Sequence, residues 1–142
     1  MIFEARKIFP LVYFIIFNFS FFYGQDLPPI ENISPIDYNA GNQNWAISQS
    51  EDNTIYIANN SGLLEYNGGD WNLYVSQNGS ILRSVKVIDN LVYTGCYMDF
   101  GYWKENDLGN LTYYSLINKL DEPLLEDEQF WNILKFDDWI LF

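Results

Sequence analysis

The 142-residue sequence contains no histidine and a single cysteine, Cys96. These absences exclude an intrachain disulfide framework and any site that uses imidazole as a metal ligand or as an acid–base group. A nucleophilic Cys96 would lack a histidine partner, so we interpret it as a small strand residue. Basic residues are also scarce, because 7 Lys and Arg stand against 19 Asp and Glu, for a formal net charge of −12. Such a chain repels phosphate backbones, and we predict no direct nucleic-acid binding.

Apolar and aromatic residues are abundant instead. Hydrophobic residues make up 49% of the sequence and aromatic residues 19%. This content excludes a uniformly disordered acidic chain. Tyr, Trp, Phe and Ile suit pleated, half-buried surfaces, so the composition indicates a strand-rich domain.

The first 24 residues differ in kind from the rest. Two basic residues precede an almost wholly apolar run at 8–23, and the small Gly24 ends this run before the polar Gln25. This order is typical of a secretory signal peptide, and it predicts cleavage between Gly24 and Gln25. An uncleaved membrane anchor is the alternative, because Phe22 is larger than the usual residue at its place before the cut. In both cases we expect the acidic remainder to be exported.

After the predicted cut, short apolar runs alternate with turn residues. Residues 25–44 hold three of the five prolines without any period, which predicts an extended lead-in. Gly62 follows Asn59-Asn60-Ser61 between two runs, where a turn with positive φ is expected. The first group of runs predicts four strands, at 45–48, 55–58, 63–66 and 71–74.

This group of four strands recurs. The correspondences join Ile55–Ala58 to Leu91–Thr94, Gly62 to Gly101, Trp71 to Leu111 and Tyr74 to Tyr114, and a third copy starts near Trp131. A period of about 40 residues with four short strands per unit is typical of propeller blades. We therefore predict an all-β partial β-propeller of about two and a half four-stranded antiparallel blades. An all-β sandwich made from the same hairpins is the alternative.

The repeats suggest boundaries along the chain. Blade 1 is predicted at 45–80, blade 2 at 81–128 with an acidic loop, and the start of a truncated blade 3 at 129–142. The one helix-like stretch, 120–130, contains Pro123, so we expect a loop or a single turn there.

The segment 53–68 resembles the two-component-regulator propeller repeat. In that family a strand and a small polar turn are followed by Gly-Leu, two residues and Tyr, and Gly62, Leu63 and Tyr66 match this pattern. Tyr56-Ile57-Ala58-Asn59 stands where the family usually has Trp-Ile-Gly-Thr. Residues 38–46 also resemble the lead-in of members with a Tyr-Asn-Ala…Asn-Gln-Asn-Trp-Ala run. The resemblance covers roughly residues 35–142.

The resemblance implies a sensing role. In such proteins the propeller is the extracytoplasmic sensor of a membrane-spanning bacterial regulator, and a triple-tyrosine domain, a membrane helix and a histidine-kinase or LuxR-type effector usually follow. It therefore implies an exported N-terminal fragment of a signalling or transcription regulator, on the periplasmic side of the inner membrane. Its ligand would be a small molecule or a glycan, and a homodimer is one arrangement it allows. A fragment of a secreted glycan-binding or glycan-active propeller is the alternative.

Few residues suggest chemistry. Tyr97, Tyr102 and Trp103 surround the turn of the second copy and Asp99 adds a polar edge, so these four are weak candidates for a ligand platform. Packing of the aromatic rings between blades is the competing interpretation. Adjacent carboxylates are ordinary turn formers, and we predict no catalytic residue, no metal site and no cofactor, and hence no enzyme. The acidic run at 121–128 is expected to be a solvated loop, with calcium attraction as the alternative.

Overall fold

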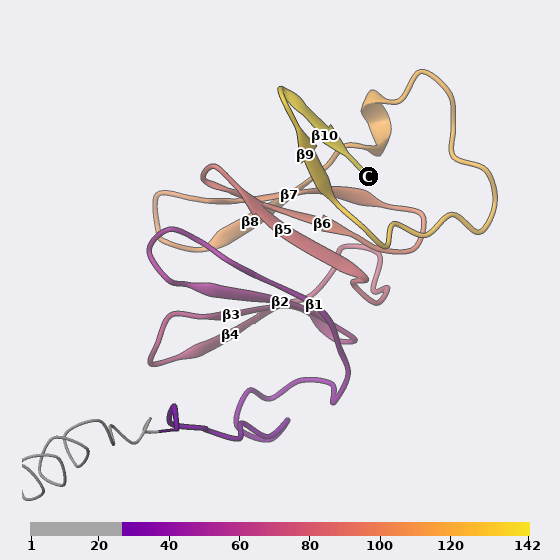
Figure 1. The fold of residues 1–142 in the computed structure, drawn as a ribbon. Helices are drawn as coiled ribbons and strands as arrows, with labels where there is room; N and C mark the ends of the chain where they lie inside the picture. The colour runs from indigo at the N-terminus through magenta and orange to yellow at the C-terminus, as the bar shows by residue number, and fades with distance from the viewer. Residues whose placement is uncertain (1–26) are drawn as a thin grey trace, which may run out of the picture. The chain divides into compact units, whose positions relative to one another are not determined.

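The computed structural model describes residues 27–142, so the predicted signal peptide and its cleavage site at Gly24–Gln25 lie outside the described residues. Every strand belongs to one compact unit, residues 33–142. This unit contains three antiparallel sheets of four, four and two strands, shown one above another in Figure 1. No helix within residues 27–142 has the length and apolar character needed to cross a membrane. The prediction of an all-β fold is confirmed.

The strands follow one another in each sheet in chain order. The first sheet consists of β1 (Asn44–Gln49), β2 (Ile55–Asn59), β3 (Gly62–Tyr66) and β4 (Trp71–Tyr74). The second consists of β5 (Ser84–Ile88), β6 (Leu91–Gly95), β7 (Phe100–Glu105) and β8 (Leu111–Ser115). A hairpin of β9 (Leu134–Phe136) and β10 (Trp139–Leu141) forms the third. The four strands predicted in the first repeat are confirmed to within about one residue at each end.

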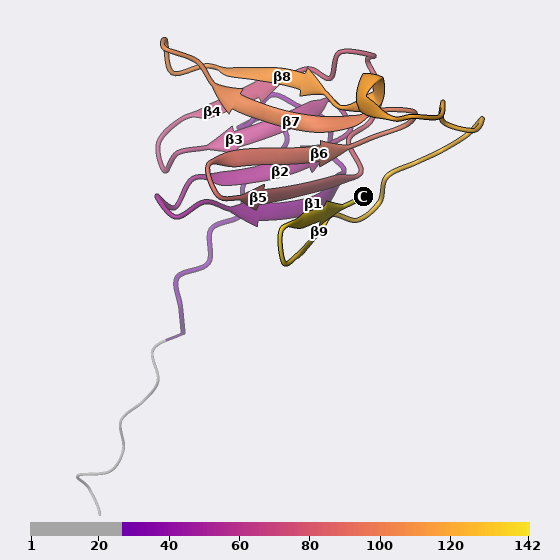
Figure 2. The same cartoon turned by 90° about the horizontal axis from the view of Figure 1, so that it is seen from above.

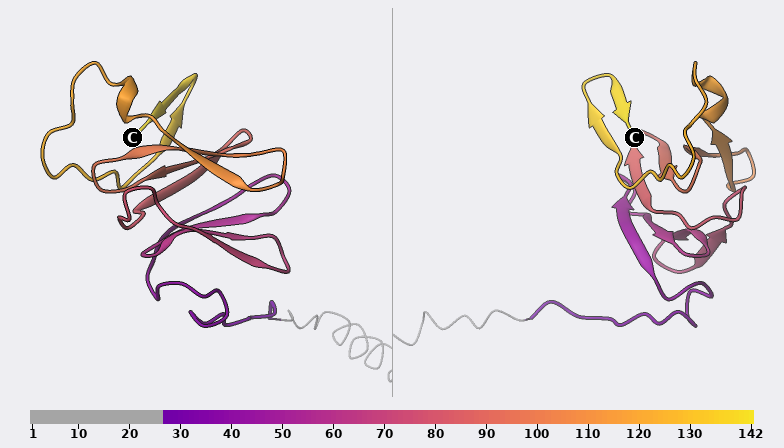
Figure 3. Two further views of the ribbon diagram at one scale, coloured as in Figure 1. Left: turned by 180° about the vertical axis from the view of Figure 1, so that it is seen from behind. Right: turned by 90° about the vertical axis from the view of Figure 1, so that its right-hand side faces the viewer.

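The connections differ from the expectations in one place. Turns at residues 35–39 interrupt the predicted extended lead-in, and Asp37 stabilises them by accepting hydrogen bonds from the backbone and hydroxyl of Ser34, both at 2.7 Å. The 120–130 stretch is irregular, as predicted, and a short 3₁₀ helix, η1 (Ile117–Lys119), precedes it. Figure 3 shows this connection extending beyond the sheets before the chain returns to β9.

The two four-stranded sheets stack head to tail. The face of the first sheet that carries Tyr56, Ala58 and Leu63 packs on a face of the second sheet, and together they form the main core (Figure 2). The second sheet contributes Val85, Val92 and Trp103 to this core. Its opposite face carries Tyr93, whose ring lies 6.2 Å from that of Phe142 after the hairpin. Each sheet thus receives the next element on the same side.

Strand register shows which residues of the two repeats are equivalent. Tyr56 pairs with Ser48 and Glu65 on the face toward the second sheet, and Tyr93 pairs with Lys86 and Tyr102 on the face toward the hairpin. The two tyrosines therefore lie on equivalent faces of their sheets, whereas the sequence comparison set Tyr56 against Val92, which faces the other way. A shift of one residue exchanges the two faces of a strand. The sequence comparison was wrong by this one residue because both runs are apolar on both faces.

Three equivalent positions also contact one another at the start of each repeat. The Arg83 guanidinium lies over both indoles, 4.2 Å from the ring centroid of Trp45 and 4.7 Å from that of Trp131. The two indoles meet edge to face at 5.6 Å. A cation over an indole ring is a favourable electrostatic arrangement, so this three-residue cluster links all three repeats.

The expected turn geometry at Gly62 is confirmed and has a steric cause. Its φ is 141°, a value that side chains rarely allow, and a Cβ added there would collide with the carbonyl oxygen of Tyr74. We expect Gly62→Val to lower the free energy of unfolding by at least about 2 kcal/mol, measured by urea unfolding. Gly69→Val is the control, because the nearest atom to a Cβ there is 3.7 Å away. Equal losses for the two variants would contradict this explanation.

Candidate functional site

The four residues proposed from the sequence as a ligand platform do not share one surface. Tyr102 and Trp103 follow one another in β7 and therefore point to opposite faces. Trp103 is 4% exposed in the core, while Tyr102 stacks on Tyr114 at 5.2 Å on the face toward the hairpin. Tyr97 and Asp99 lie together in the turn between β6 and β7. The structure thus brings only this last pair together.

Asp99 lines a hollow of about 350 Å³ at one end of the second sheet. Its carboxylate accepts a hydrogen bond from the Ser115 hydroxyl at 2.6 Å, and its carbonyl oxygen accepts one from the Cys96 backbone at 2.9 Å. Both contacts fix the turn that carries it. The other lining residues are Gln77, Asn78, Met98, Ile117 and Asn118. Three amides, a carboxylate and a hydroxyl offer a mixed set of donors and acceptors, which suits a polar, hydroxyl-bearing ligand.

Tyr97 stands beside this hollow with its ring 43% exposed. Asn78 holds its backbone by donating to the Tyr97 carbonyl oxygen at 3.0 Å. The phenol donates to Asp127 Oδ1 at 3.0 Å, and this hydrogen bond raises the pKa of Tyr97. The predicted acidic loop therefore returns against the turn between β6 and β7, where the Met98 backbone also donates to the Glu128 carbonyl oxygen.

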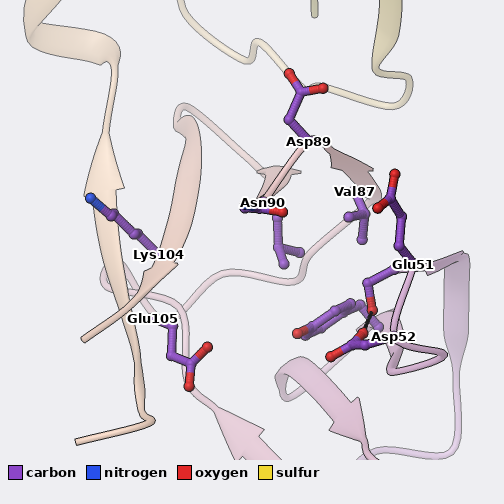
Figure 4. A pocket seen from close by; sticks show the side chains of 10 residues that line it. Glu51, Asp52, Val87, Asp89, Asn90, Lys104 and Glu105 are labelled. Carbon is purple, nitrogen blue, oxygen red and sulfur yellow. Dashed lines mark hydrogen bonds between the residues drawn. The ribbon is translucent and has the colours of Figure 1, made fainter. Parts of the chain in front are cut away.

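A second cleft lies between the two four-stranded sheets and was missed from the sequence. It has a volume of about 490 Å³, and Figure 4 shows the side chains of Asp52 and Glu105 on two sides of it, while the carboxylates of Glu51 and Asp89 point away from this pair. The acidic residues are Glu51, Asp52, Asp89 and Glu105, with Lys104 beside them. The cleft favours cationic groups by charge. Within residues 27–142, however, no three His, Cys, Asp or Glu side chains are grouped so as to hold a metal ion.

Two side chains of this cleft also have structural roles. Asp52 accepts hydrogen bonds from the Ser50 hydroxyl and from the Thr54 backbone, and these bonds lower the pKa of its carboxyl group. Tyr56 lines the cleft while belonging to the core, and burial is the main cause of its raised pKa. The charges of Glu65 and Asp52 add to this effect. In the sequence, the signal for this cleft was an acidic residue in or directly beside each of the turns that follow β1, β5 and β7.

Cys96 lies directly after β6 and is 3% exposed. Burial is the main cause of the raised pKa of its thiol. A buried thiol with a raised pKa is mostly protonated and reacts slowly, because the thiolate is the nucleophile. Cys96 was interpreted from the sequence as a small strand residue; it lies one residue beyond the strand, and its burial in the core shows that it is a packing residue.

Tyr74 gives the core a dependence on alkaline pH. Burial, helped by a 2.8 Å hydrogen bond to Glu65, raises its pKa from 10.0 to about 12. The neutral phenol stabilises the fold fully below pH 10, and this contribution is lost as the pH rises toward 12, because the unfolded chain releases its proton first. We expect urea unfolding of Tyr74→Phe to show a smaller loss of stability over this range than the wild type. Val75→Ala, at a 65% exposed position without an ionisable group, should keep the wild-type slope, and equal slopes for all three proteins would contradict the assignment.

No protein-family model matches this chain, and searches of curated proteins and of solved structures find no match either.

Proposed function

We propose that this chain is a partial β-propeller that serves as the exported sensing portion of a transmembrane signalling or transcription regulator. The observation that carries the propeller is the head-to-tail stacking of two four-stranded sheets. Each sheet would be one blade, and the β9–β10 hairpin would start the next. The sensing role rests on the likeness of residues 53–68 to the two-component-regulator repeat.

The distribution of apolar residues supports the propeller over a sandwich. In a sandwich each sheet hides one apolar face and presents a polar one to solvent. Here the second sheet has apolar residues on both faces. Trp103 packs against the first sheet, and on the other side the ring centroid of Phe100 lies 4.5 Å from that of Phe142. Stacking of successive blades requires such two-faced sheets.

The proposed ligand site is the hollow beside Asp99. Its amide and hydroxyl groups, with the exposed ring of Tyr97 next to them, are the groups with which proteins hold sugars and other polar small molecules. The same features favour the second candidate function, a glycan-binding propeller without an effector. Binding accounts for these residues better than catalysis, since the one thiol is buried and the chain has no histidine.

A genetic experiment tests the sensing role. Cells that lack the coding sequence are grown on a panel of polysaccharides and small polar nutrients, and their transcripts are compared with those of the parent. We expect loss of induction of a specific set of genes. Restoring the full-length gene should recover induction, the double variant Gln77→Ala/Asn118→Ala in the hollow should not, and Glu51→Ala in the opposite cleft should. Unchanged transcripts in the deletion strain under every condition would contradict the signalling role.

A further inference from the structure

One residue of the acidic cleft combines a buried ring with an unpaired polar group. Tyr56 is 9% exposed, and its ring belongs to the core between the two four-stranded sheets, yet it also lines the cleft. Within residues 27–142 its hydroxyl has no hydrogen-bond partner, whereas the hydroxyl of Tyr74 donates to Glu65. The Tyr56 oxygen is not sealed off, because the one buried side-chain atom without a partner in this part of the chain is Nη1 of Arg83. The hydroxyl is therefore open to a group that enters the cleft.

Two carboxylates beside this hydroxyl have free acceptor capacity. Asp52 follows β1 and Glu105 ends β7, so each four-stranded sheet supplies one of them, on two sides of the cleft (Figure 4). The hydrogen bonds that Asp52 accepts from Ser50 and Thr54 both end on its Oδ1, which leaves Oδ2 available. The Glu105 carboxylate takes part in no hydrogen bond or ion pair within the described residues, where the one ion pair lies elsewhere. Both carboxylates can thus accept from a ligand.

The negative charge of the cleft acts on the Tyr56 hydroxyl and is not neutralised there. Burial is the main cause of the raised pKa of Tyr56, and the charges of Glu65, Asp52 and Glu105 raise it further. The phenol therefore stays neutral and can both accept and donate a hydrogen bond. Lys104 precedes Glu105 in β7, and successive residues of a strand point to opposite faces. Figure 4 accordingly shows the Lys104 ammonium directed away from the two carboxylates.

The number and kind of these groups indicate which cation suits the cleft. Calcium takes roughly six to eight oxygen ligands, but no three acidic side chains within residues 27–142 are grouped so as to hold a metal ion. A primary ammonium group has only three N–H donors. The cleft offers three acceptors for them, on Asp52, Tyr56 and Glu105. Its volume of about 490 Å³ is in the range of sites for small molecules.

We propose that this cleft binds a small primary amine, whose ammonium group donates to Asp52, Tyr56 and Glu105 between the two four-stranded sheets. The site is separate from the hollow beside Asp99, and it rests on the packing of the two sheets and not on the sensing role. A bound amine would join a carboxylate of the first sheet to one of the second, so it would stabilise the folded chain as its concentration rises. Diamines and amino sugars both carry the required group.

Titrations of the full chain test the site and separate these two sources. The probes are putrescine and glucosamine, and binding is followed by NMR shifts of backbone amides and by the melting temperature. Butanediol and N-acetylglucosamine are the counterparts without an ammonium group, and tetramethylammonium carries the charge without N–H donors. We expect at least one of the two amines to shift the amides of residues 50–54 and 103–106, to raise the melting temperature, and to bind less tightly as salt is added. None of the three controls should do so.

Variants assign the binding to the named side chains. Glu105→Gln and Asp52→Asn should each weaken amine binding about tenfold, because each removes a charged acceptor. Asparagine keeps an Oδ1 for the hydrogen bonds of the turn. Tyr56→Phe retains the ring in the core and should weaken binding about threefold. Glu51→Gln is the matched control, because it removes the same charge from a carboxylate that points away from the pair, so its affinity should stay close to that of the wild type.

Several results would overturn the proposal. They are a wild type that binds neither amine, a control compound that binds as tightly as the amines, and equal losses for Glu51→Gln and Glu105→Gln. Calcium that displaces the amines would also contradict it, because the cleft would then be a metal site. If Asp52→Asn or Tyr56→Phe fails to fold, Glu105→Lys at an exposed strand end replaces it, and amine binding that survives this change contradicts the site. The titrations measure no induction, so their failure leaves the sensing role standing, and absent induction in the genetic experiment leaves the amine site standing.

Discussion

Trp103→Ala is expected to lower the free energy of unfolding by about 4 kcal/mol, the largest loss for any single truncation in the core. Trp103 lies between the two four-stranded sheets, 4% exposed. Its ring centroid is 5.9 Å from that of Tyr74 in the first sheet and 4.9 Å from that of Tyr113 in the second. Its indole nitrogen also donates to Thr94 Oγ1 at 2.8 Å. Truncation therefore removes packing between the sheets and leaves a buried hydroxyl without its donor.

The control is an aromatic residue of the same sheet outside this core. Tyr114 in β8 is 46% exposed on the opposite face, so we expect Tyr114→Ala to cost only about 1 kcal/mol. Urea unfolding of both variants checks the difference. Trp103→Phe combined with Thr94→Val should lose less than the sum of the two single changes, because both partners of the hydrogen bond are then removed. A Trp103→Ala variant that loses no more than Tyr114→Ala would contradict the placement of Trp103 between the sheets.

The positions of the strands could be predicted from the sequence because polar turn residues bound each apolar run. The Asn59-Asn60-Ser61-Gly62 break is one such boundary, and the structure places a tight connection between β2 and β3 there. Which side chains of each strand point toward the core was harder to predict. Ile55-Tyr56-Ile57-Ala58 has no polar side that would show which face is buried, so a comparison of repeats from the sequence cannot show that Tyr56 and Val92 point to opposite faces of their sheets.

The candidate sites were predicted less well, for a different reason. Strand alternation alone separates Tyr102 from Trp103, so the sequence already argued against a platform that contained both. The acidic cleft depends on which strand ends and turns meet at one end of the stack, and its carboxylates are as distant in the chain as Glu51 and Glu105. Only the packing of one sheet on the other brings them together.

Asn59→Leu should lower the free energy of unfolding by about 3 kcal/mol, because Asn59 joins the lead-in to the first sheet through hydrogen bonds that no apolar side chain can replace. Its side chain is fully buried. The amide nitrogen donates to the Gly41 carbonyl oxygen at 2.6 Å and to Asn44 Oδ1 at 2.7 Å. The amide oxygen accepts from the backbone of Gly41 at 3.1 Å and of Ser61 at 2.8 Å. Leucine at this position would leave buried groups on both sides unpaired.

The neighbouring asparagine supplies the control for this last prediction. Asn60 makes one side-chain hydrogen bond, accepting from the Trp45 indole at 2.8 Å, and this bond is exposed, so we expect Asn60→Leu to cost about 1 kcal/mol or less. Native-state hydrogen exchange locates the effect. In Asn59→Leu the Gly41 and Ser61 amides should exchange much faster than in the wild type, and limited proteolysis should cut the lead-in near residues 35–41 first. Unchanged exchange at both amides would mean that Asn59 does not hold the lead-in to the sheet, even if the overall stability fell.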